Sequence, residues 1–327
     1  MSIDFRAERD LALLTLEREQ SAPARAEAAE ALCELAAEVP RELRGEFAPA
    51  VVRLLSDKQV EVRCAGLALC VEAVSAEEAV EILTRHVADP QPRVRVEAVG
   101  RLADLARPDL RGVLAAALQD EAPQVRFEAA RGMVALKHSA GLDVLLDALD
   151  DPDLRFRAAA ALARLGNKDA VPRLKRAFHA WLIPAFDRTQ LAGALASLGE
   201  AEGVAHLFKR ASKTWSMDRA MAIELLGEVK AAGAKERLLE ILRDPKDEGR
   251  GAAARGLGRL GDVTLEPELL AALADDTLTD DLRLDLAEAL LLLGGEAGRA
   301  KASALVLKDP DARAELAAML RETTVQP

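Results

Sequence analysis

Tyrosine is absent from this chain of 327 residues, and aromatic residues make up only 3% of it. Runs in which β-branched and polar residues alternate are also absent, so the sequence carries no signal for β-strands. Hydrophobic residues nevertheless account for 50% of the chain, and many of them are Ala and Leu, which favour helices. Helices rich in alanine can pack closely without bulky core residues, so the composition favours an all-α protein.

A surplus of positive charge is lacking as well. The formal net charge is −11 and the isoelectric point is about 5.1. Proteins that bind the phosphate backbone of nucleic acids in a general way present a basic surface. The charge therefore disfavours nucleic acid as a partner, although it leaves room for a local basic patch.

Cysteine is scarce, and no long hydrophobic run occurs. Cys33, Cys64 and Cys70 are odd in number and form no CxxC pair, so we interpret them as small buried residues in a reducing compartment. No apolar run approaches the roughly 18 residues that a membrane-spanning helix needs. The first six residues lack the basic and then apolar segments of a secretory signal. These absences make a cytoplasmic location the expectation.

An arginine, in contrast, returns at intervals of 29 to 38 residues along almost the whole chain. The ten positions are Arg25, Arg63, Arg95, Arg126, Arg155, Arg188, Arg219, Arg250, Arg283 and Arg313. A period of this length is typical of a solenoid, in which each repeat is one small helical unit stacked on its neighbours.

Each arginine begins the apolar pattern of a helix. A small residue or leucine stands three positions later, and Leu, Cys or Met stands seven positions later, as Ala98 and Leu102 do after Arg95. Offsets of 0, 3, 7 and 10 lie on one face of an α-helix. A second apolar helix precedes the arginine, as at residues 142–146 and 238–242, and a short polar turn with an aspartate joins the two helices.

This succession of apolar helix, aspartate-containing turn, arginine, alanine and leucine resembles the HEAT repeat, in the short bacterial form also found in phycobilin lyases. The match is clearest over residues 89–105, 120–136 and 244–260. The resemblance implies an all-α fold, a right-handed α-solenoid or superhelix of about ten HEAT-like helix pairs. We expect one solenoid over residues 1–327, with an N-terminal cap unit at 1–47, central repeats at 48–295, and a C-terminal cap unit and tail at 296–327.

The resemblance also assigns a structural role to the recurring Asp and Arg, a hydrogen-bonded ladder between the turns of adjacent units. The residues expected to form this ladder are Asp57, Arg63, Asp89, Arg95, Asp120, Arg126, Asp244 and Arg250. A well-oriented contact of this kind contributes about 1.5–3 kcal/mol. We therefore interpret these residues as structural and not as ligand contacts.

The repeat is least regular over residues 168–219. The turn aspartate is missing six positions before Arg188 and Arg219, and both tryptophans, Trp181 and Trp215, lie here with Phe186 and Lys213. Nine basic residues face five acidic ones, so the segment is net +4. Trp and Arg are enriched at binding hot spots. Two interpretations stay open, bulkier packing in two wider units or a partner-binding site formed by Trp181, Phe186, Arg188, Lys213 and Trp215.

A charged stripe at offsets 2, 5 and 9 from each arginine gives a second signal. It is mostly acidic in the first four and last two units, whereas the middle units carry Arg157, Arg164, Arg255 and Arg259. In HEAT arrays this helix lines the concave surface. The pattern therefore predicts a second ring of contacts there, for a partner with a basic region that the acidic ends attract.

Motifs for catalysis and metal binding do not assemble. Residues 256–261 match GxGxxG, but no strand precedes them, so the dinucleotide-binding interpretation fails. No histidine is followed by glutamate, unlike the His-Glu pairs with which helical-repeat deoxyhypusine hydroxylases bind iron. The four histidines lack the spacing of metal ligands. We therefore expect no cofactor and no metal.

The favoured function is a non-catalytic scaffold or regulatory adaptor that binds another protein on the concave face. Two enzyme-class alternatives stay open. One is a HEAT-like alkylpurine DNA glycosylase. The tryptophans and the local positive charge favour this alternative, whereas the acidic flanks disfavour it. The other is a phycobilin lyase-like subunit, which shares the repeat, although nothing in the sequence identifies a bilin site.

Overall fold

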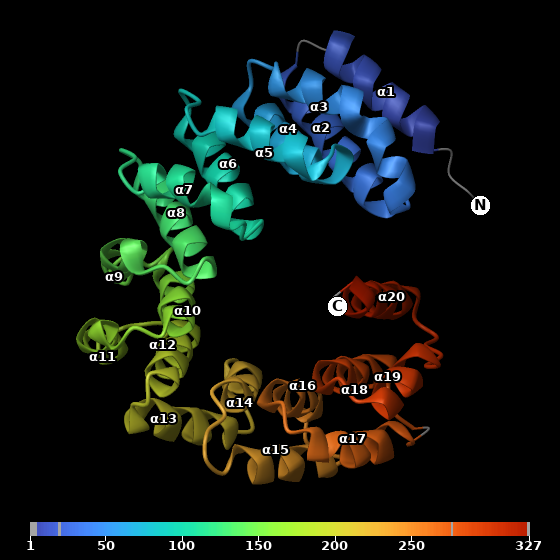
Figure 1. The fold of residues 1–327 in the computed structure, drawn as a ribbon. Helices are drawn as coiled ribbons and strands as arrows, with labels where there is room; N and C mark the ends of the chain where they lie inside the picture. Colours follow the sequence, from blue (N-terminus) through green and yellow to red (C-terminus); the bar gives the residue numbers. More distant parts are fainter. Residues whose placement is uncertain (1–4, 19–20, 276, 326–327) are drawn as a thin grey trace. The chain divides into compact units, whose positions relative to one another are not determined.

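The computed structural model of the chain describes residues 5–18, 21–275 and 277–325, and all of the regular structure there is helical (Figure 1). This confirms the all-α class. The chain divides into two compact units, Met1–Ala148 and Leu149–Pro327, and we describe each unit by itself. Residues 1–4 of the predicted N-terminal cap and residues 326–327 of the predicted tail lie outside the described residues. One continuous solenoid over residues 1–327 stays a prediction.

The first unit contains nine α-helices and three short 3-10 helices among its described residues. They are α1 (Phe5–Arg18), α2 (Ala22–Glu38), η1 (Arg41–Phe47), α3 (Ala48–Leu55), α4 (Val60–Ala73), α5 (Ala76–His86), α6 (Pro92–Asp104), η2 (Pro108–Leu110), α7 (Arg111–Ala117), α8 (Pro123–Ala135), η3 (Ser139–Gly141) and α9 (Leu142–Ala148). Consecutive helices pair, α1 with α2, α3 with α4, α5 with α6 and α7 with α8, and the even-numbered members pack on one another in order.

The second unit follows the same plan. It contains α10 (Arg155–Leu165), η4 (Lys168–Ala170), α11 (Val171–Phe178), α12 (Ala185–Ser197), α13 (Ala201–Ala211), α14 (Arg219–Glu228), α15 (Ala234–Arg243), α16 (Arg250–Leu260), η5 (Val263–Leu265), α17 (Glu266–Leu273), α18 (Asp280–Leu293), α19 (Glu296–Ser303) and α20 (Pro310–Val325). Each even-numbered helix from α10 to α20 packs on the next even-numbered helix. All ten recurring arginines lie in even-numbered helices, so the predicted helix pairs are confirmed.

Local sequence signals explain where these helices begin and end. Proline occupies the first turn of α6 and α8, where its missing N–H costs no helical hydrogen bond. The Ser75 side chain caps α5 by accepting from the N–H of Glu78. At the other end, Gly166 closes α10 with φ +68°, a left-handed conformation that glycine adopts without steric cost.

In each unit, the apolar positions after the recurring arginines form the core. The residues seven positions after the first nine arginines are at most 1% exposed, and they are Leu32, Cys70, Leu102, Met133, Leu162, Leu195, Leu226, Leu257 and Leu290. Burying one such leucine contributes about 1.5–3 kcal/mol. Because each seam is shared by two helix pairs, the stack is stabilised by its neighbour contacts.

The GxGxxG match at residues 256–261 has a packing explanation. A Cβ on Gly227 in α14 would lie 1.9 Å from the carbonyl oxygen of Gly256, and a Cβ on Gly258 would lie 2.7 Å from Cα of Ala289 in α18. These glycines therefore let α14, α16 and α18 approach closely. Gly261 ends α16 with φ +72°.

Candidate functional site

Three of the four recurring arginines of the first unit, Arg25, Arg63 and Arg95, reach forward to the turn of the next helix pair. Arg63 donates to both carboxylate oxygens of Asp89 at 3.1 Å, and Arg95 donates to those of Asp120 at 2.8 and 2.9 Å. Asp57 accepts in the same way from Arg25 at 3.3 Å. Hydrogen bonding by Arg95 lowers the pKa of Asp120, so this carboxylate is charged at neutral pH.

Two of the residues expected in this ladder make other contacts, and one is misassigned. Arg126 donates to the backbone oxygens of Asp120 and Glu121 in its own turn, and Arg250 donates to that of Leu242. We predicted Asp244 as a ladder acceptor, but its side chain accepts from the N–H of Lys246. The acceptor in this turn is instead Asp247, which binds Arg219.

The length of the turn between α15 and α16 explains why Asp247, and not Asp244, accepts from Arg219. Arg219 Nη1 and Nη2 donate to Asp247 Oδ1 and Oδ2 at 2.6 and 2.7 Å. Asp247 stands three positions before Arg250, whereas Asp244 stands six before it. Residues 244–249 separate α15 from α16, so the aspartate nearer to the second helix is the one in reach. The Arg219 hydrogen bonds lower the pKa of Asp247.

The irregular segment 168–219 keeps buried aspartates, but at another position in the repeat. Asp187 and Asp218 stand directly before Arg188 and Arg219, and both are buried. Asp187 accepts from Arg155 at 3.2 Å, so it continues the ladder from α10 to α12. The segment therefore departs from the consensus in sequence more than in its buried polar contacts.

The same segment exposes its large apolar side chains. Trp181 and Leu182, in residues 179–184 between α11 and α12, are 89% and 80% exposed. Trp215 and Met217, in residues 212–218 between α13 and α14, are 90% and 87% exposed. We call these two connections the aromatic loops. Bulkier core packing, one of the two interpretations of this segment, does not describe these side chains, because they face solvent.

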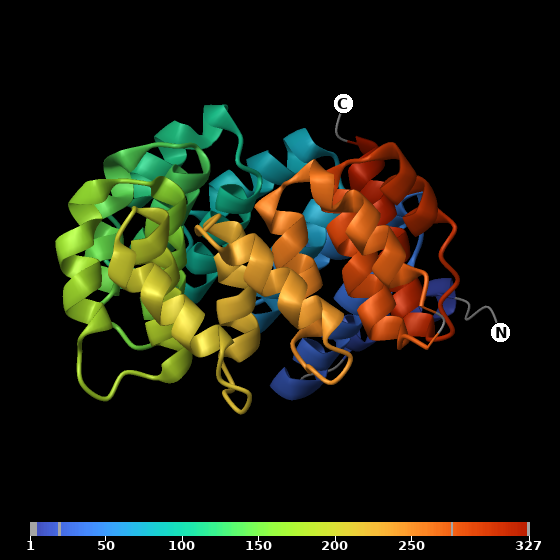
Figure 2. The same cartoon turned by 90° about the horizontal axis from the view of Figure 1, so that it is seen from below.

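The two aromatic loops lie on the same edge of the second unit. Both connect the first helix of a pair to the second, and Figure 2 shows them projecting beyond the helix ends along one edge. The helix that follows the first loop contacts the second loop, because Thr189 in α12 donates from Oγ1 to Asp218 Oδ2 at 2.5 Å. Asp218 ends the second loop, and Thr189 lies five residues after the first.

The base of the first aromatic loop is held by Arg188. Its Nη2 donates to the carbonyl oxygen of Ala180 at 3.0 Å, directly before Trp181. Leu182 adopts φ +59°, a left-handed conformation that costs a residue with a Cβ about 1–2 kcal/mol. Such strain persists only where the surrounding structure imposes it. Arg188, predicted as a partner contact, therefore positions this loop.

The base of the second aromatic loop is held by Asp218. This side chain is fully buried and accepts from Arg210 Nε at 2.8 Å, besides Thr189 and the hydroxyl of Ser216. Burial opposes ionisation of Asp218, but these hydrogen bonds outweigh it and hold the pKa far below the usual 3.8. His206, 3.4 Å from Thr189, has its pKa lowered by burial.

The remaining predicted contacts of this region divide into two groups. Lys213 is exposed in the second aromatic loop, and Phe186, 41% exposed, lies in the first turn of α12 after the first loop. The structure therefore places Trp181, Phe186, Lys213 and Trp215 at the accessible edge. In contrast, the predicted second ring of arginines is not brought together there.

Arg255 and Arg259 are neutralised by carboxylates of neighbouring helices. Arg255 donates to Glu224 Oε1 at 2.7 Å and also pairs with Asp285, and Arg259 pairs with the other oxygen of Glu224. Arg157 and Arg164 are exposed on α10. The charged stripe thus consists partly of ion pairs between neighbouring helices, because Arg255 and Arg259 of α16 lie against Glu224 of α14, and Arg255 also lies against Asp285 of α18.

Sequence reasoning missed several residues of this site. Leu182 and Met217 stand beside the tryptophans in stretches without helical periodicity, and that combination was the available signal for exposed loops. The roles of Thr189 and Asp218 had no local signal, because their contact joins residues 29 positions apart.

In the part of the chain that the structure describes, no group of three or more His, Cys, Asp or Glu side chains is placed to hold a metal ion. Over the same residues, no helix combines the length and the apolar character needed to cross a bilayer.

Comparison with known proteins gives similarity to several helical-repeat structures. The complex of CpcE and CpcF of phycocyanin lyase from Nostoc sp. PCC7120 is 18% identical, with 75% of this chain and 94% of that chain covered and a TM-score of 0.47. Kap121p is 12% identical, with 98% and 46% covered and a TM-score of 0.47. Human deoxyhypusine hydroxylase is 21% identical, with 75% and 97% covered and a TM-score of 0.33. No curated protein sequence matches the chain.

The family comparison is decisive for the repeat. The model of HEAT repeats matches residues 81–161, 113–181 and 204–291, which together make up more than half of the chain. These segments include six of the ten recurring arginines, namely Arg95, Arg126, Arg155, Arg219, Arg250 and Arg283. The chain therefore belongs to the HEAT-repeat family.

Proposed function

We propose that this protein is a non-catalytic scaffold or regulatory adaptor that binds another protein through the aromatic loops. The observation that carries the proposal is the exposure of Trp181 and Trp215, which are 89% and 90% accessible. Most other large apolar side chains of the described residues are buried. A tryptophan buries about 150–250 Å² at an interface. At about 25 cal/mol per Å², each indole would contribute several kcal/mol before the costs of association.

The support beneath the loops strengthens this proposal. Arg188 fixes the first loop at Ala180, and Asp218 fixes the second through Arg210 and Thr189. Side chains on a fixed base lose less conformational freedom on binding than side chains on a mobile loop. Exposed tryptophans on such a base have the character of hot-spot residues.

The proposed contact surface differs from the one that the charged stripe favoured. Trp181, Phe186, Lys213 and Trp215 lie in or next to helix connections, and Arg255 and Arg259 are engaged by carboxylates. We therefore assign the contact to the edge of the second unit and not to the exposed faces of its even-numbered helices. The neutralised arginines also speak against a nucleic-acid channel, which would need free positive charge.

Affinity capture tests the proposal. The tagged protein, its Trp181→Ala/Trp215→Ala variant and a matched Val52→Ala/Val263→Ala variant are used to capture proteins from a lysate of the source organism. Val52 and Val263 are exposed apolar residues outside the loops. We expect a protein bound by the wild type and the valine variant to be lost by the tryptophan variant, and calorimetry with that purified protein should repeat the order.

Two outcomes would contradict the proposal. One is capture of the same proteins by all three baits. The other is binding of DNA at low salt that weakens as salt rises, measured by fluorescence anisotropy with single-stranded and duplex oligonucleotides. That result would instead favour a nucleic-acid enzyme.

A further inference from the structure

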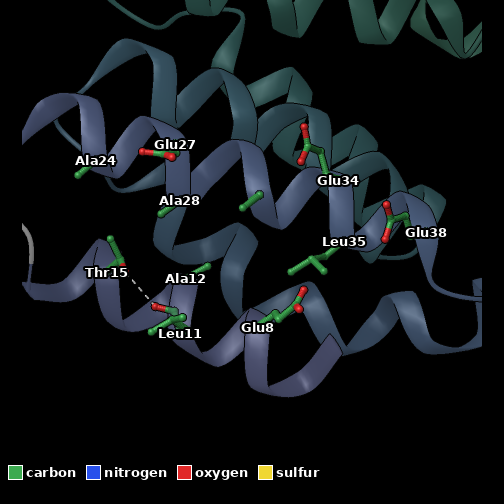
Figure 3. Close-up of a pocket in the computed structure, with 11 residues that line it drawn as sticks. Glu8, Leu11, Ala12, Thr15, Ala24, Glu27, Ala28, Glu34, Leu35 and Glu38 are labelled. Carbon is green, nitrogen blue, oxygen red and sulfur yellow. Dashed lines mark hydrogen bonds between the residues drawn. The ribbon is translucent and has the colours of Figure 1, made fainter. Parts of the chain in front are cut away.

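A groove of about 600 Å³ runs between α1 and α2 in the first unit (Figure 3). Its apolar lining includes Leu11, Ala12, Ala28, Ala31 and Leu35. Leu11 is 65% exposed, although it lies among other apolar side chains. The alanines leave the groove open, because their short side chains do not fill the space between the two helices.

The groove lies on the side of α2 that faces α1. Ala29, Leu32 and Ala36, which adjoin the groove lining on α2, are buried, and α2 also packs on α4 in the regular stack. The groove therefore adjoins the shared seam, with Ala28 and Leu35 at the border between them, and its glutamates lie outside that seam.

Four glutamates line this apolar surface. Glu27, Glu34 and Glu38 lie along one side of α2, and Glu8 lies on α1 (Figure 3). None of the four forms an ion pair with another described residue, whereas nearby Glu46 pairs with Arg6 and Arg9. Like charges gathered without counter-charges repel one another, so the fold gains nothing from this arrangement.

We propose that this groove binds a basic amphipathic α-helix of a partner protein. The apolar side of such a helix would cover Leu11, Leu35 and the alanine floor, and its Lys or Arg side chains would reach the glutamates over their flexible stems. From Glu27 to Glu38 the helix rise is about 16 Å, the length of three turns of a bound helix. A second copy of this chain fits poorly, because the two acidic rims would face each other.

This inference does not depend on the aromatic loops. Its residues belong to the first unit and the loops to the second, so loss of binding in variants of one region leaves the other testable. The groove also has its own charge selectivity. An acidic helix of the same shape should be repelled from it.

Peptide binding tests the inference directly. The probe is a labelled helical peptide of about 14 residues with Leu on one side and Lys on the rest, and its control carries Glu in place of each Lys. We compare the full chain with the triple variant Glu27→Gln/Glu34→Gln/Glu38→Gln by fluorescence anisotropy. A second triple variant, Glu30→Gln/Glu42→Gln/Glu77→Gln, has the same change in net charge at exposed residues outside the groove.

The lysine peptide should bind the wild type and the second triple variant with similar affinity, and the groove variant about tenfold or more weakly, because three ion pairs of about 0.5 kcal/mol each are lost. Ala31→Phe, which fills the groove without a charge change, should also block binding, with circular dichroism melting to confirm its fold. Equal weakening by both triple variants, equal binding of the glutamate peptide, or no binding at low salt would overturn the inference.

Discussion

Arg188 donates a hydrogen bond to the carbonyl oxygen of Ala180 at 3.0 Å, so α12 holds the residue directly before Trp181. Trp215 has comparable support, because Asp218, three residues later, accepts from Arg210 and Thr189. Each aromatic loop thus joins a fixed base to an exposed indole. The physical case for a partner contact rests on this combination, since the apolar area is already presented and little ordering remains for the binding step.

Intrinsic fluorescence reports on these loops alone, because Trp181 and Trp215 are the two tryptophans of the chain. We predict that the native protein emits at the long wavelength of hydrated indole and is strongly quenched by acrylamide. Complete unfolding in urea should then shift the emission maximum very little, while circular dichroism records the loss of helix. A native spectrum shifted to short wavelength would mean that the indoles are buried, and Trp→Phe variants would identify which one.

Asp218 should make stability depend on acid pH. Burial opposes its ionisation, yet hydrogen bonds from Arg210, Ser216 and Thr189 hold its pKa far below the usual 3.8. Because the folded-state pKa lies below the unfolded-state one, this stabilisation is complete above about pH 4 and is lost as the pH falls further. At pH 7, Asp218→Asn should cost about 3 kcal/mol, since Arg210 keeps a partly buried charge without its partner.

Urea unfolding of both proteins at pH 7 and near pH 3 measures this effect. The difference in unfolding free energy between wild type and Asp218→Asn should shrink at the lower pH. Asp153→Asn, at an exposed turn position, serves as a control and should change stability little. A difference that stays constant between the two pH values would contradict the assigned role of the Asp218 carboxylate.

The ladder contact between Arg95 and Asp120 should be energetically coupled. Arg95 is 7% exposed and makes two bonds of 2.8 and 2.9 Å to the carboxylate. A double-mutant cycle with Arg95→Met and Asp120→Asn should give a coupling of about 1.5–3 kcal/mol by urea unfolding. The exposed pair of Arg85 and Glu81 should give a coupling below about 0.5 kcal/mol. Equal couplings would show that the ladder adds no more than a surface ion pair.

Much of this fold could be predicted from the sequence because its determinants are local and repeat. Residues three, four and seven positions apart lie on one face of a helix, and ten copies of the same pattern leave little ambiguity about the secondary structure. The acceptors of the ladder were less predictable, because turn length decides which aspartate comes within reach. Asp244 and Asp247 show this, since both stand in one turn, but in this longer connection it is Asp247 that accepts the hydrogen bonds of Arg219.

The candidate site was only half visible in the sequence. The tryptophans and the break in the pattern marked the region, but burial cannot be read from residue type when a loop leaves the helical period. Arg255 and Arg259 were assigned to a contact surface because their partners, Glu224 and Asp285, lie about 30 residues away in the chain. Contacts between neighbouring repeats, and not the repeat itself, decide which charges stay available.

Leu182 should link stability to partner binding. Its φ of +59° is strained for leucine, and glycine accepts this conformation without steric cost. Leu182→Gly is therefore expected to hold or raise the unfolding free energy by up to about 1 kcal/mol while weakening binding of the captured partner. Leu182→Ala keeps the strain and removes the side chain, so it should weaken binding without that gain. Equal stability of the two variants would argue against strain at this position.

Site-specific photo-crosslinking tests the central claim most directly. Benzoylphenylalanine is placed at Trp181, at Trp215 or at Val306, an exposed apolar residue of the second unit outside the aromatic loops, and each protein is irradiated with the captured partner. We predict crosslinks to the partner from both tryptophan positions and none from position 306. Crosslinks from position 306 alone, with none from either loop, would contradict the assignment of the aromatic loops as the partner-binding site.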